Sequence, residues 1–324
     1  MSPAEVRPKL NKLRHVSVIE VRNLVKRYGD LEAVRDLSLT VHEGEVFALL
    51  GPNGAGKSTT VEILEGHRQR SSGDVSVLGL DPGDAGRELR DRIGIVLQSS
   101  GIEDELSVRE ALEMYGSSYS SMRDPEEVVE LVGLTDKIDE RVMRLSGGQQ
   151  RRIDLALGIV GYPEVLFLDE PTTGFDPSAR RRSWELIEGL RDLGTTIVLT
   201  THYMDEAQHL ADRVGVIVRG ELVALGTPAE LMDSAGETVI TFDVSGSADL
   251  STLPVDGVIT DGRTVTIRSG ESTRTLHALT SWALDHDVEL LDLSAARPSL
   301  EDVYLELADG GDDAAENAPD GVGS

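Results

Sequence analysis

The sequence predicts an α/β fold followed by a small α+β domain, and three observations support this prediction. A glycine-rich loop at residues 51–58 lies between a short apolar run, typical of a buried strand, and a helical pattern. Further apolar runs alternate with helical patterns as far as residue 235. From residue 236 on, short strands with a tight turn are mixed with two helical stretches, so the architecture changes there.

The glycine-rich loop reads Gly-Pro-Asn-Gly-Ala-Gly-Lys-Ser, which has the form G-x-x-x-x-G-K-[ST] of a phosphate-binding loop. Its glycines let successive backbone N–H groups point at phosphate oxygens, and the positive end of the following helix attracts the same anion. Lys57 can reach the outer phosphates, and the Ser58 hydroxyl can hold Mg²⁺. A strand at 46–50 and a helix at 59–65 give the motif the context that it requires.

The composition excludes several classes of function. The chain has 324 residues, a formal net charge of −27 and no cysteine. Such a charge repels nucleic acid, so we expect no nucleic-acid partner. Without cysteine there are no disulfides or thiolate metal sites. No apolar run is long enough to span a bilayer and no secretory signal opens the chain, so we expect a protein that is soluble or held at a membrane by a partner.

The acidic, lysine-poor composition has two interpretations. It suits a protein that stays soluble at high salt, and it suits an ordinary acidic protein equally well.

The chain up to residue 97 predicts a flexible polar arm at 1–16 and then a series of strands. The strands are expected at residues 18–22, 36–41, 46–50, 75–78 and 93–97. Tyr28 lies in the turn between the first two. Its ring could stack on a nucleotide base, although an exposed tyrosine in a turn usually has no such role.

Residues 99–160 predict a helical insert. Ser107 to Glu110 has the pattern of a capping box at the start of a helix, and residues 125–132 make a second helix. A third helix follows the stretch Leu145-Ser146-Gly147-Gly148-Gln149 and runs to Val160. Two glycines at a helix start form a potential anion site, but this pattern alone is more often only a cap.

Polar residues follow two further apolar strands. The strand at 165–168 ends in Asp169 and Glu170, which can hold Mg²⁺ and deprotonate a water, respectively. Two acids at a strand end are also common on ordinary surfaces. Asp176 caps a helix that begins with proline and runs to Leu193. His202 follows the strand at 197–200 and sits toward the same edge.

The remainder predicts a hairpin at 214–225 and then the accessory domain. Its expected strands are at residues 239–244, 258–260, 265–268 and 288–293, with helices at 276–284 and 300–307. The turn Asp261-Gly262 is a strong hairpin signal. The chain after residue 308 is rich in Asp, Gly and Ala, and we expect an acidic, disordered tail at 309–324.

Taken in order, these motifs resemble the nucleotide-binding subunit of ATP-binding cassette (ABC) transporters over roughly residues 17–235. The resemblance implies a P-loop NTPase core with an antiparallel β subdomain and a helical insert at about 99–160, followed by an α+β domain at 236–308. It also implies ATP and Mg²⁺ as cofactors. The partners that it implies are a second copy of the chain and a separate membrane permease, at the cytoplasmic face of the cell membrane.

The resemblance implies a role for each motif residue. Tyr28 would stack on adenine, while Ser146, Gly147, Gly148 and Gln149 would contact the ATP of the opposite subunit and Asp176 would lie at the dimer seam. The implied catalytic residues are Lys57, Gln98, Glu170 and His202, with Glu170 as the general base, and the implied metal residues are Ser58, Gln98 and Asp169. The implied phosphate cradle is Gly51, Pro52, Asn53, Gly54, Ala55, Gly56, Lys57, Ser58 and Thr59.

Three stretches and the C-terminal domain favour one branch of the family. The strand-rich C-terminal domain and residues 171–174, 201–207 and 300–307 resemble the drug-export branch typified by the daunorubicin/doxorubicin-resistance ATPases, with Phe175 in place of the usual leucine. The prediction is therefore the ATP-hydrolysing subunit of a drug or lipid exporter. The alternatives are the ATPase of an importer or a polysaccharide exporter, or an ABC ATPase without a transport function.

Overall fold

The computed structural model describes residues 16–97, 101–234, 236–244, 250–255, 257–305 and 307. These residues form two compact units that divide between Leu222 and Val223. The predicted arm at 1–16, Gln98 and the predicted tail lie wholly or almost wholly outside the described residues. The domain limits drawn from the sequence stay predictions.

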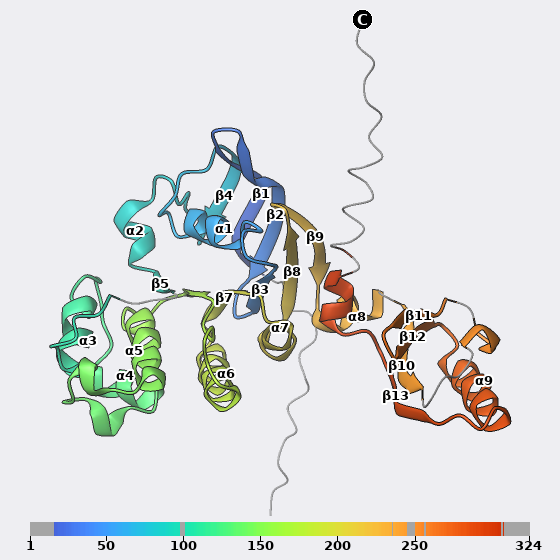
Figure 1. Cartoon of the computed structure of the whole chain (residues 1–324). Helices are drawn as coiled ribbons and strands as arrows, with labels where there is room; N and C mark the ends of the chain where they lie inside the picture. The colour runs from blue at the N-terminus through green and yellow to red at the C-terminus, as the bar shows by residue number, and fades with distance from the viewer. Residues whose placement is uncertain are drawn as a thin grey trace, which may run out of the picture. The chain divides into compact units, whose positions relative to one another are not determined.

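The first unit contains an antiparallel sheet and a mostly parallel one (Figure 1). The antiparallel sheet has the order β2-β1-β4, from β1 (Ser17–Tyr28), β2 (Leu31–His42) and β4 (Ser72–Val77). Tyr28 is thus the last residue of β1 and not a turn residue as predicted, because β1 and β2 stay paired up to Tyr28 and Leu31.

The other sheet has the order β5-β6-β7-β3-β8-β9, and the pairs formed by β5, β6, β7, β3 and β8 are parallel. Its strands are β3 (Val46–Leu50), β5 (Ile93–Val96), β6 (Val165–Asp169), β7 (Thr196–Thr201), β8 (Arg213–Val218) and β9 (Glu221–Gly226), and the division between the two units falls within β9. Every residue of β3 and β7 is buried, as the continuous apolar runs predict for strands covered on both faces.

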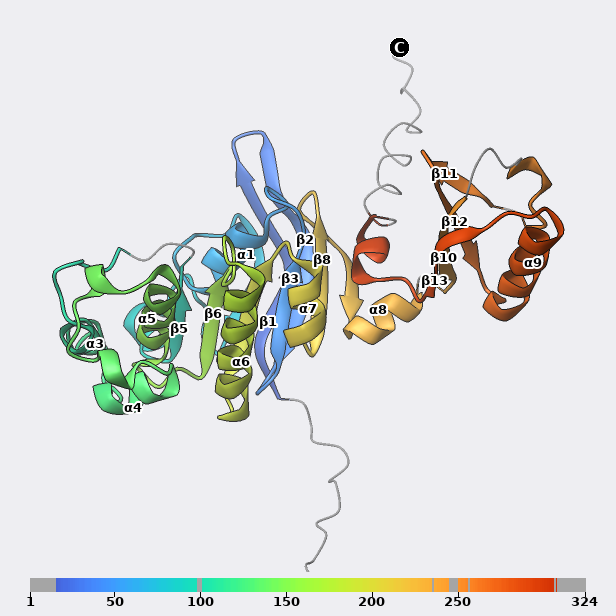
Figure 2. The same cartoon turned by 60° about the horizontal axis from the view of Figure 1, so that its bottom comes forward.

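The helices of the first unit include a group that is separate from the antiparallel sheet. In both views α3, α4 and α5 lie together, away from β1, β2 and β4 (Figures 1 and 2). The helices are α1 (Lys57–Leu64), α2 (Gly86–Arg90), α3 (Val108–Gly116), α4 (Pro125–Leu131), α5 (Gly147–Ile159), α6 (Pro177–Asp192) and α7 (Met204–Leu210). The predicted capping box is present, since the Ser107 N–H donates to Glu110 Oε2 at 2.8 Å.

The second unit holds a four-stranded antiparallel sheet with the order β11-β12-β10-β13, after helix α8 (Pro228–Ser234). Apolar residues of β10 and β12 form a core with Leu279 of α9. The elements are β10 (Thr238–Val244), β11 (Ile259–Asp261), β12 (Thr264–Ser269), α9 (Ser272–Asp285) and β13 (Leu290–Ala296), and residues 300–305 are helical.

The parallel sheet decides where the functional residues gather. The strand β7 lies between β3 and β6, with Thr201 opposite Leu50 on one side and Thr200 opposite Asp169 on the other. The carboxyl ends of three parallel strands therefore meet at one edge, which is where open α/β sheets bind ligands.

Candidate nucleotide-binding site

The phosphate-binding loop leaves β3 at Gly51 and enters α1 at Lys57, two residues before the predicted helix start. Gly56 makes this early start possible, because its φ of +105° lies in the left-handed region where other residues are strained. A Cβ at Gly56 would lie 2.5 Å from the carbonyl oxygen of Ala33, and a Cβ at Gly51 would lie 2.3 Å from that of Ile217. Any other side chain at these two positions would therefore clash with a backbone carbonyl oxygen.

Lys57 is buried at the start of α1. Its Nζ donates to the carbonyl oxygens of Gly51 and Pro52 at 2.8 and 3.1 Å and lies 3.8 Å from Glu170 Oε1. Burial lowers the pKa of Lys57, while the carboxylates of Glu170 and Asp169 oppose that shift. The ammonium group is thus held at the closed end of the loop by carbonyl and carboxylate oxygens.

Asp169 and Ser58 place two oxygen ligands side by side. The Ser58 hydroxyl donates to Asp169 Oδ1 at 3.4 Å. Thr200 of the neighbouring strand donates to the same carboxylate oxygen and so fixes its orientation. A hydroxyl and a carboxylate oxygen from different elements are the kind of donors that bind Mg²⁺ together with phosphate oxygens.

Glu170 follows β6 in an unusual backbone conformation. Its φ is +45°, which is strained for a residue other than glycine and is typical of functional sites. The Glu170 N–H donates to the Thr200 hydroxyl at 3.0 Å, and the Thr173 hydroxyl donates to Glu170 Oε2 at 3.0 Å. His202 Nδ1 lies 3.2 Å from Glu170 Oε1. The carboxylate therefore contacts the Thr173 hydroxyl, the His202 ring and the Lys57 ammonium group.

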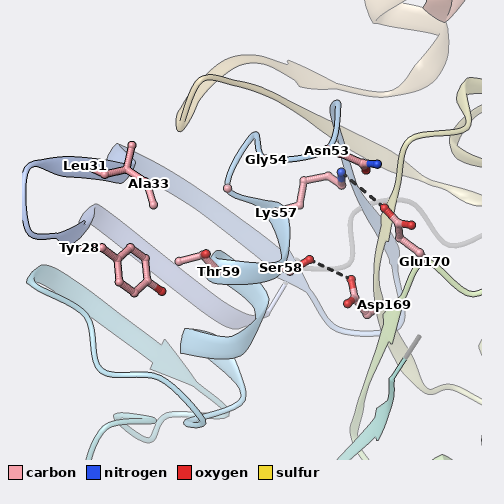
Figure 3. Close-up of a pocket in the computed structure, with 11 residues that line it drawn as sticks. Tyr28, Leu31, Ala33, Asn53, Gly54, Lys57, Ser58, Thr59, Asp169 and Glu170 are labelled. Atoms are coloured by element: carbon pink, nitrogen blue, oxygen red, sulfur yellow. Dashed lines mark hydrogen bonds and ion pairs between the residues drawn. The ribbon is translucent and has the colours of Figure 1, made fainter. Parts of the chain in front are cut away.

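A cavity of about 470 Å³ joins most of these residues (Figure 3). Tyr28 lies at one side of it and Asp169 and Glu170 at the other, with the loop between them. The Tyr28 ring is 39% exposed and has Lys26 Nζ 4.9 Å and Arg68 Cζ 5.3 Å from its centroid. The lining residues are Tyr28, Leu31, Ala33, Asn53, Gly54, Gly56, Lys57, Ser58, Thr59, Asp169 and Glu170.

The glycine pair at the start of α5 does not line this cavity. Ser146, Gly148 and Gln149 line a separate cavity of about 160 Å³, together with Phe175 and Arg182. Gln149 Oε1 accepts a hydrogen bond from the Ser146 N–H at 2.9 Å, so it caps α5. Asp176 caps α6 in the same way, accepting from the N–H groups of Ser178 and Ala179 at 2.8 and 2.9 Å.

Comparison with known proteins identifies the family. The chain is 38% identical over 303 residues to the daunorubicin/doxorubicin resistance ATP-binding protein DrrA of Streptomyces peucetius, covering 89% of this chain and 92% of that protein. It is 40% identical over 300 residues to the Nod factor export ATP-binding protein I of Rhizobium meliloti, covering 89% and 87%. The chain belongs to the ATP-binding subunits of ABC transporters.

Two further matches agree with this family. The ABC transporter family model matches residues 34–173, and a model described as an ABC transporter domain-containing protein-like C-terminal domain matches residues 238–299. The dimeric structure of MJ0796, a bacterial ABC transporter cassette, is similar with a TM-score of 0.56 and 25% identity, over 64% of this chain and 98% of that one. These matches confirm the predicted P-loop NTPase fold and an ABC ATPase that binds and hydrolyses ATP.

The residues at or beside this cavity that were not predicted from the sequence include Thr200, Thr173 and Leu31. Thr200 orients Asp169, and Thr173 holds the second oxygen of Glu170. Leu31 adds an apolar contact surface to the cavity near Tyr28. Thr173 directly follows the Asp169–Thr172 stretch, so its hydroxyl was a usable signal, whereas the other two depend on strand pairing. In the part of this ABC ATPase that the structure describes, no helix is long and apolar enough to cross a membrane.

Proposed function

We propose that this chain is the ATP-hydrolysing subunit of an ABC exporter. In this role it dimerises around two ATP molecules and drives a separate membrane permease from the cytoplasmic face of the cell membrane. The names of two relatives that the chain covers almost end to end support export, since one is a resistance protein and the other an export protein. The expected export of a drug or lipid-like molecule rests on this similarity.

The single cavity that unites Lys57, Ser58, Asp169 and Glu170 carries the proposed chemistry. We assign the loop and Lys57 to the phosphates and Tyr28 to the adenine. Ser58 and Asp169 would hold Mg²⁺, which supplies positive charge against the phosphate oxygens when bound. The other proposed metal residue, Gln98, lies outside the described residues.

Glu170 is the proposed general base. Its carboxylate would take a proton from the water that attacks the terminal phosphate, and Lys57 would offset the charge that builds up on the phosphate oxygens. His202 lies close enough to Glu170 for its ring to contact the same phosphate group or the water. Thr173 and Thr200 hold the base and its neighbour in place.

A second chain would complete the site. Ser146, Gly148 and Gln149 line their own cavity, so a role at the nucleotide cavity of the same chain has no support. A glycine-led helix start offers free N–H groups to an anion, and we assign it to the ATP of a partner copy, with Asp176 at the seam. The dimeric state of a similar cassette supports this arrangement.

The test combines purified protein and cells. For Glu170→Gln we expect ATP binding within a fewfold of wild type and phosphate release lowered by roughly 100-fold or more, because the amide keeps the shape but cannot accept the proton. Cells that make only this variant should retain daunorubicin to the level of cells lacking the protein, while wild type lowers it. Near wild-type phosphate release would remove Glu170 from its role. Drug retention that is equal for all three strains, with ATPase activity lost as expected, would instead favour export of another class of molecule.

A further inference from the structure

A buried carboxyl group behind the nucleotide cavity has no part in the chemistry described above. Glu206 lies on α7 and is 0% exposed. Its Oε1 accepts hydrogen bonds from the Thr172 hydroxyl at 2.7 Å and from the Trp184 indole N–H at 3.2 Å. One carboxyl oxygen thus joins α7, α6 and the segment that follows Glu170.

Thr172 links this carboxyl to the proposed base. Thr172 is itself fully buried and is the neighbour of Thr173, whose hydroxyl donates to Glu170 Oε2 at 3.0 Å. The two successive threonines therefore each donate a hydrogen bond to a different carboxyl group. Thr172 donates to the buried Glu206, and Thr173 donates to Glu170, which lines the cavity. A shift of Thr172 would move Thr173 with it, because the two share a peptide bond.

The helix α7, which carries Glu206, also lies close in the chain to His202. The helix begins two residues after His202, whose Nδ1 lies 3.2 Å from Glu170 Oε1. The segments after β6 and β7 are thus in contact at two places, between Glu170 and His202 and between Thr172 and Glu206. The buried contact is shielded from water, so its hydrogen bond is stronger than an exposed one.

We propose that Glu206 is a positioning residue for ATP hydrolysis, which holds Glu170 in line with the attacking water through Thr172 and Thr173. The proposal rests on the role of Glu170 as the base. A purely space-filling role would be better served by an apolar side chain, because a buried carboxyl group loses its hydration. Burial raises the pKa of Glu206. A glutamine at this position keeps an acceptor oxygen for Thr172 and Trp184.

The first experiment measures kcat and KM for ATP hydrolysis and the Kd for ATP on the full chain. Thr172→Val keeps the shape and removes the donor; we expect kcat to fall by roughly 10- to 100-fold, since small displacements of a reacting group have effects of that size. The Kd for ATP should stay within about threefold, because nothing in the phosphate loop changes. Glu206→Gln keeps the acceptor oxygen, so its kcat should stay within about threefold of wild type. The kcat of Glu206→Ala should fall as much as that of Thr172→Val.

The matched control is Glu188→Gln. Glu188 Oε1 lies 3.7 Å from His209 Nε2, so it also joins α6 to α7, but its side chain is 37% exposed, whereas Glu206 is buried. We expect unchanged kcat for this variant. Thermal unfolding of every variant separates loss of fold from loss of position, and Thr172→Val remains informative if Glu206→Ala fails to fold.

The deciding experiment places Thr172→Val in the Glu170→Gln background and measures residual hydrolysis under single-turnover conditions. If Thr172 acts through the base, removing it causes no further loss once the base is gone. An equal loss in both backgrounds would overturn the proposal, as would full activity of Thr172→Val or a Glu206→Gln variant as inactive as Glu206→Ala. Wild-type turnover of Glu170→Gln alone would mean that the assignment of the base had failed, which is a separate result.

Discussion

At the scale of single residues, Lys57 shows how the fold prepares a charge for a ligand. Its side chain is 4% exposed and its Nζ already meets two carbonyl oxygens and the Glu170 carboxylate. A buried ammonium group of this kind loses hydration, and the surrounding oxygens replace it. The group is therefore placed in advance for a phosphate oxygen, at little further cost in hydration.

We expect Lys57→Ala to weaken the binding of ATP much more than that of adenosine. A hydrogen bond to a charged group contributes about 1.5–3 kcal/mol, so the Kd for ATP should rise by roughly 10- to 100-fold. Adenosine, assigned to Tyr28 at the other side of the cavity, should be affected less than about twofold. Titration calorimetry with both ligands measures this, with Lys137→Ala as a control in the helical insert. An equal loss for both ligands would mean that the variant damages the fold instead.

At the scale of elements, helix caps account for several residues that also have a predicted binding role. Asp176 holds the first turn of α6 through two backbone N–H groups, and Gln149 holds the start of α5. Each cap satisfies donors that a helix start otherwise leaves unpaired. A capping residue is thus a structural part of its own chain, whatever it contacts in a partner.

We expect Asp176→Ala to lower the melting temperature and Asp176→Asn to preserve it, because asparagine caps a helix as well as aspartate does. The N–H groups of Ala179 and Ser178 lower the pKa of Asp176. A carboxyl group whose pKa is lowered on folding stabilises the fold above its ordinary pKa and loses that contribution as the pH falls through the folded value. The difference between wild type and Asp176→Ala should therefore be constant near neutral pH and shrink in acid. Thermal unfolding followed by circular dichroism checks this, and a difference that grows in acid would contradict it.

At the scale of the whole molecule, the nucleotide cavity and the cavity at Ser146 belong to one unit of one chain but have no lining residue in common. Hydrolysis of a phosphate bond requires positive charge or N–H donors on several sides of the phosphate. The two-fold symmetric dimer that we propose would supply the missing side to both ATP molecules at once, because each patch would meet its complement on the other copy.

Mixing two inactive variants tests this arrangement. Lys57→Ala removes the cation of its own cavity, and Ser146→Arg crowds the phosphate of the opposite chain. In a mixed dimer one composite site then carries both defects and the other carries none. We expect ATPase activity to recover when the two proteins are mixed under conditions of proven subunit exchange. No recovery would contradict the composite site if a dimer of wild type and the double mutant is active, because its wild-type chain then holds an intact site by itself.

The sequence alone predicted most of the elements and most of the residues that we assign to the nucleotide site. The phosphate loop, the acids after β6 and the histidine after β7 are recognised because each chemistry needs certain residue types at a fixed local spacing. Most strand and helix positions followed from apolar periodicity, but the helices α2 (Gly86–Arg90) and α7 (Met204–Leu210) were not predicted, and the ends of other elements, as at Lys57 and Tyr28, differed. Residue types at a fixed spacing and apolar periodicity are local properties of the sequence, so they can be recognised without the tertiary structure.

Only the tertiary structure decided which residues meet. The order β6-β7-β3 brings Thr200 to Asp169 and Ser58 to the same carboxylate, although these residues are far apart along the chain. The same packing buries Glu206 against Thr172 and Trp184, a contact for which the sequence holds no signal. Sequence spacing fixes which groups can share one helix face or strand end, but contacts between elements depend on strand order and packing, which arise only when the whole core forms.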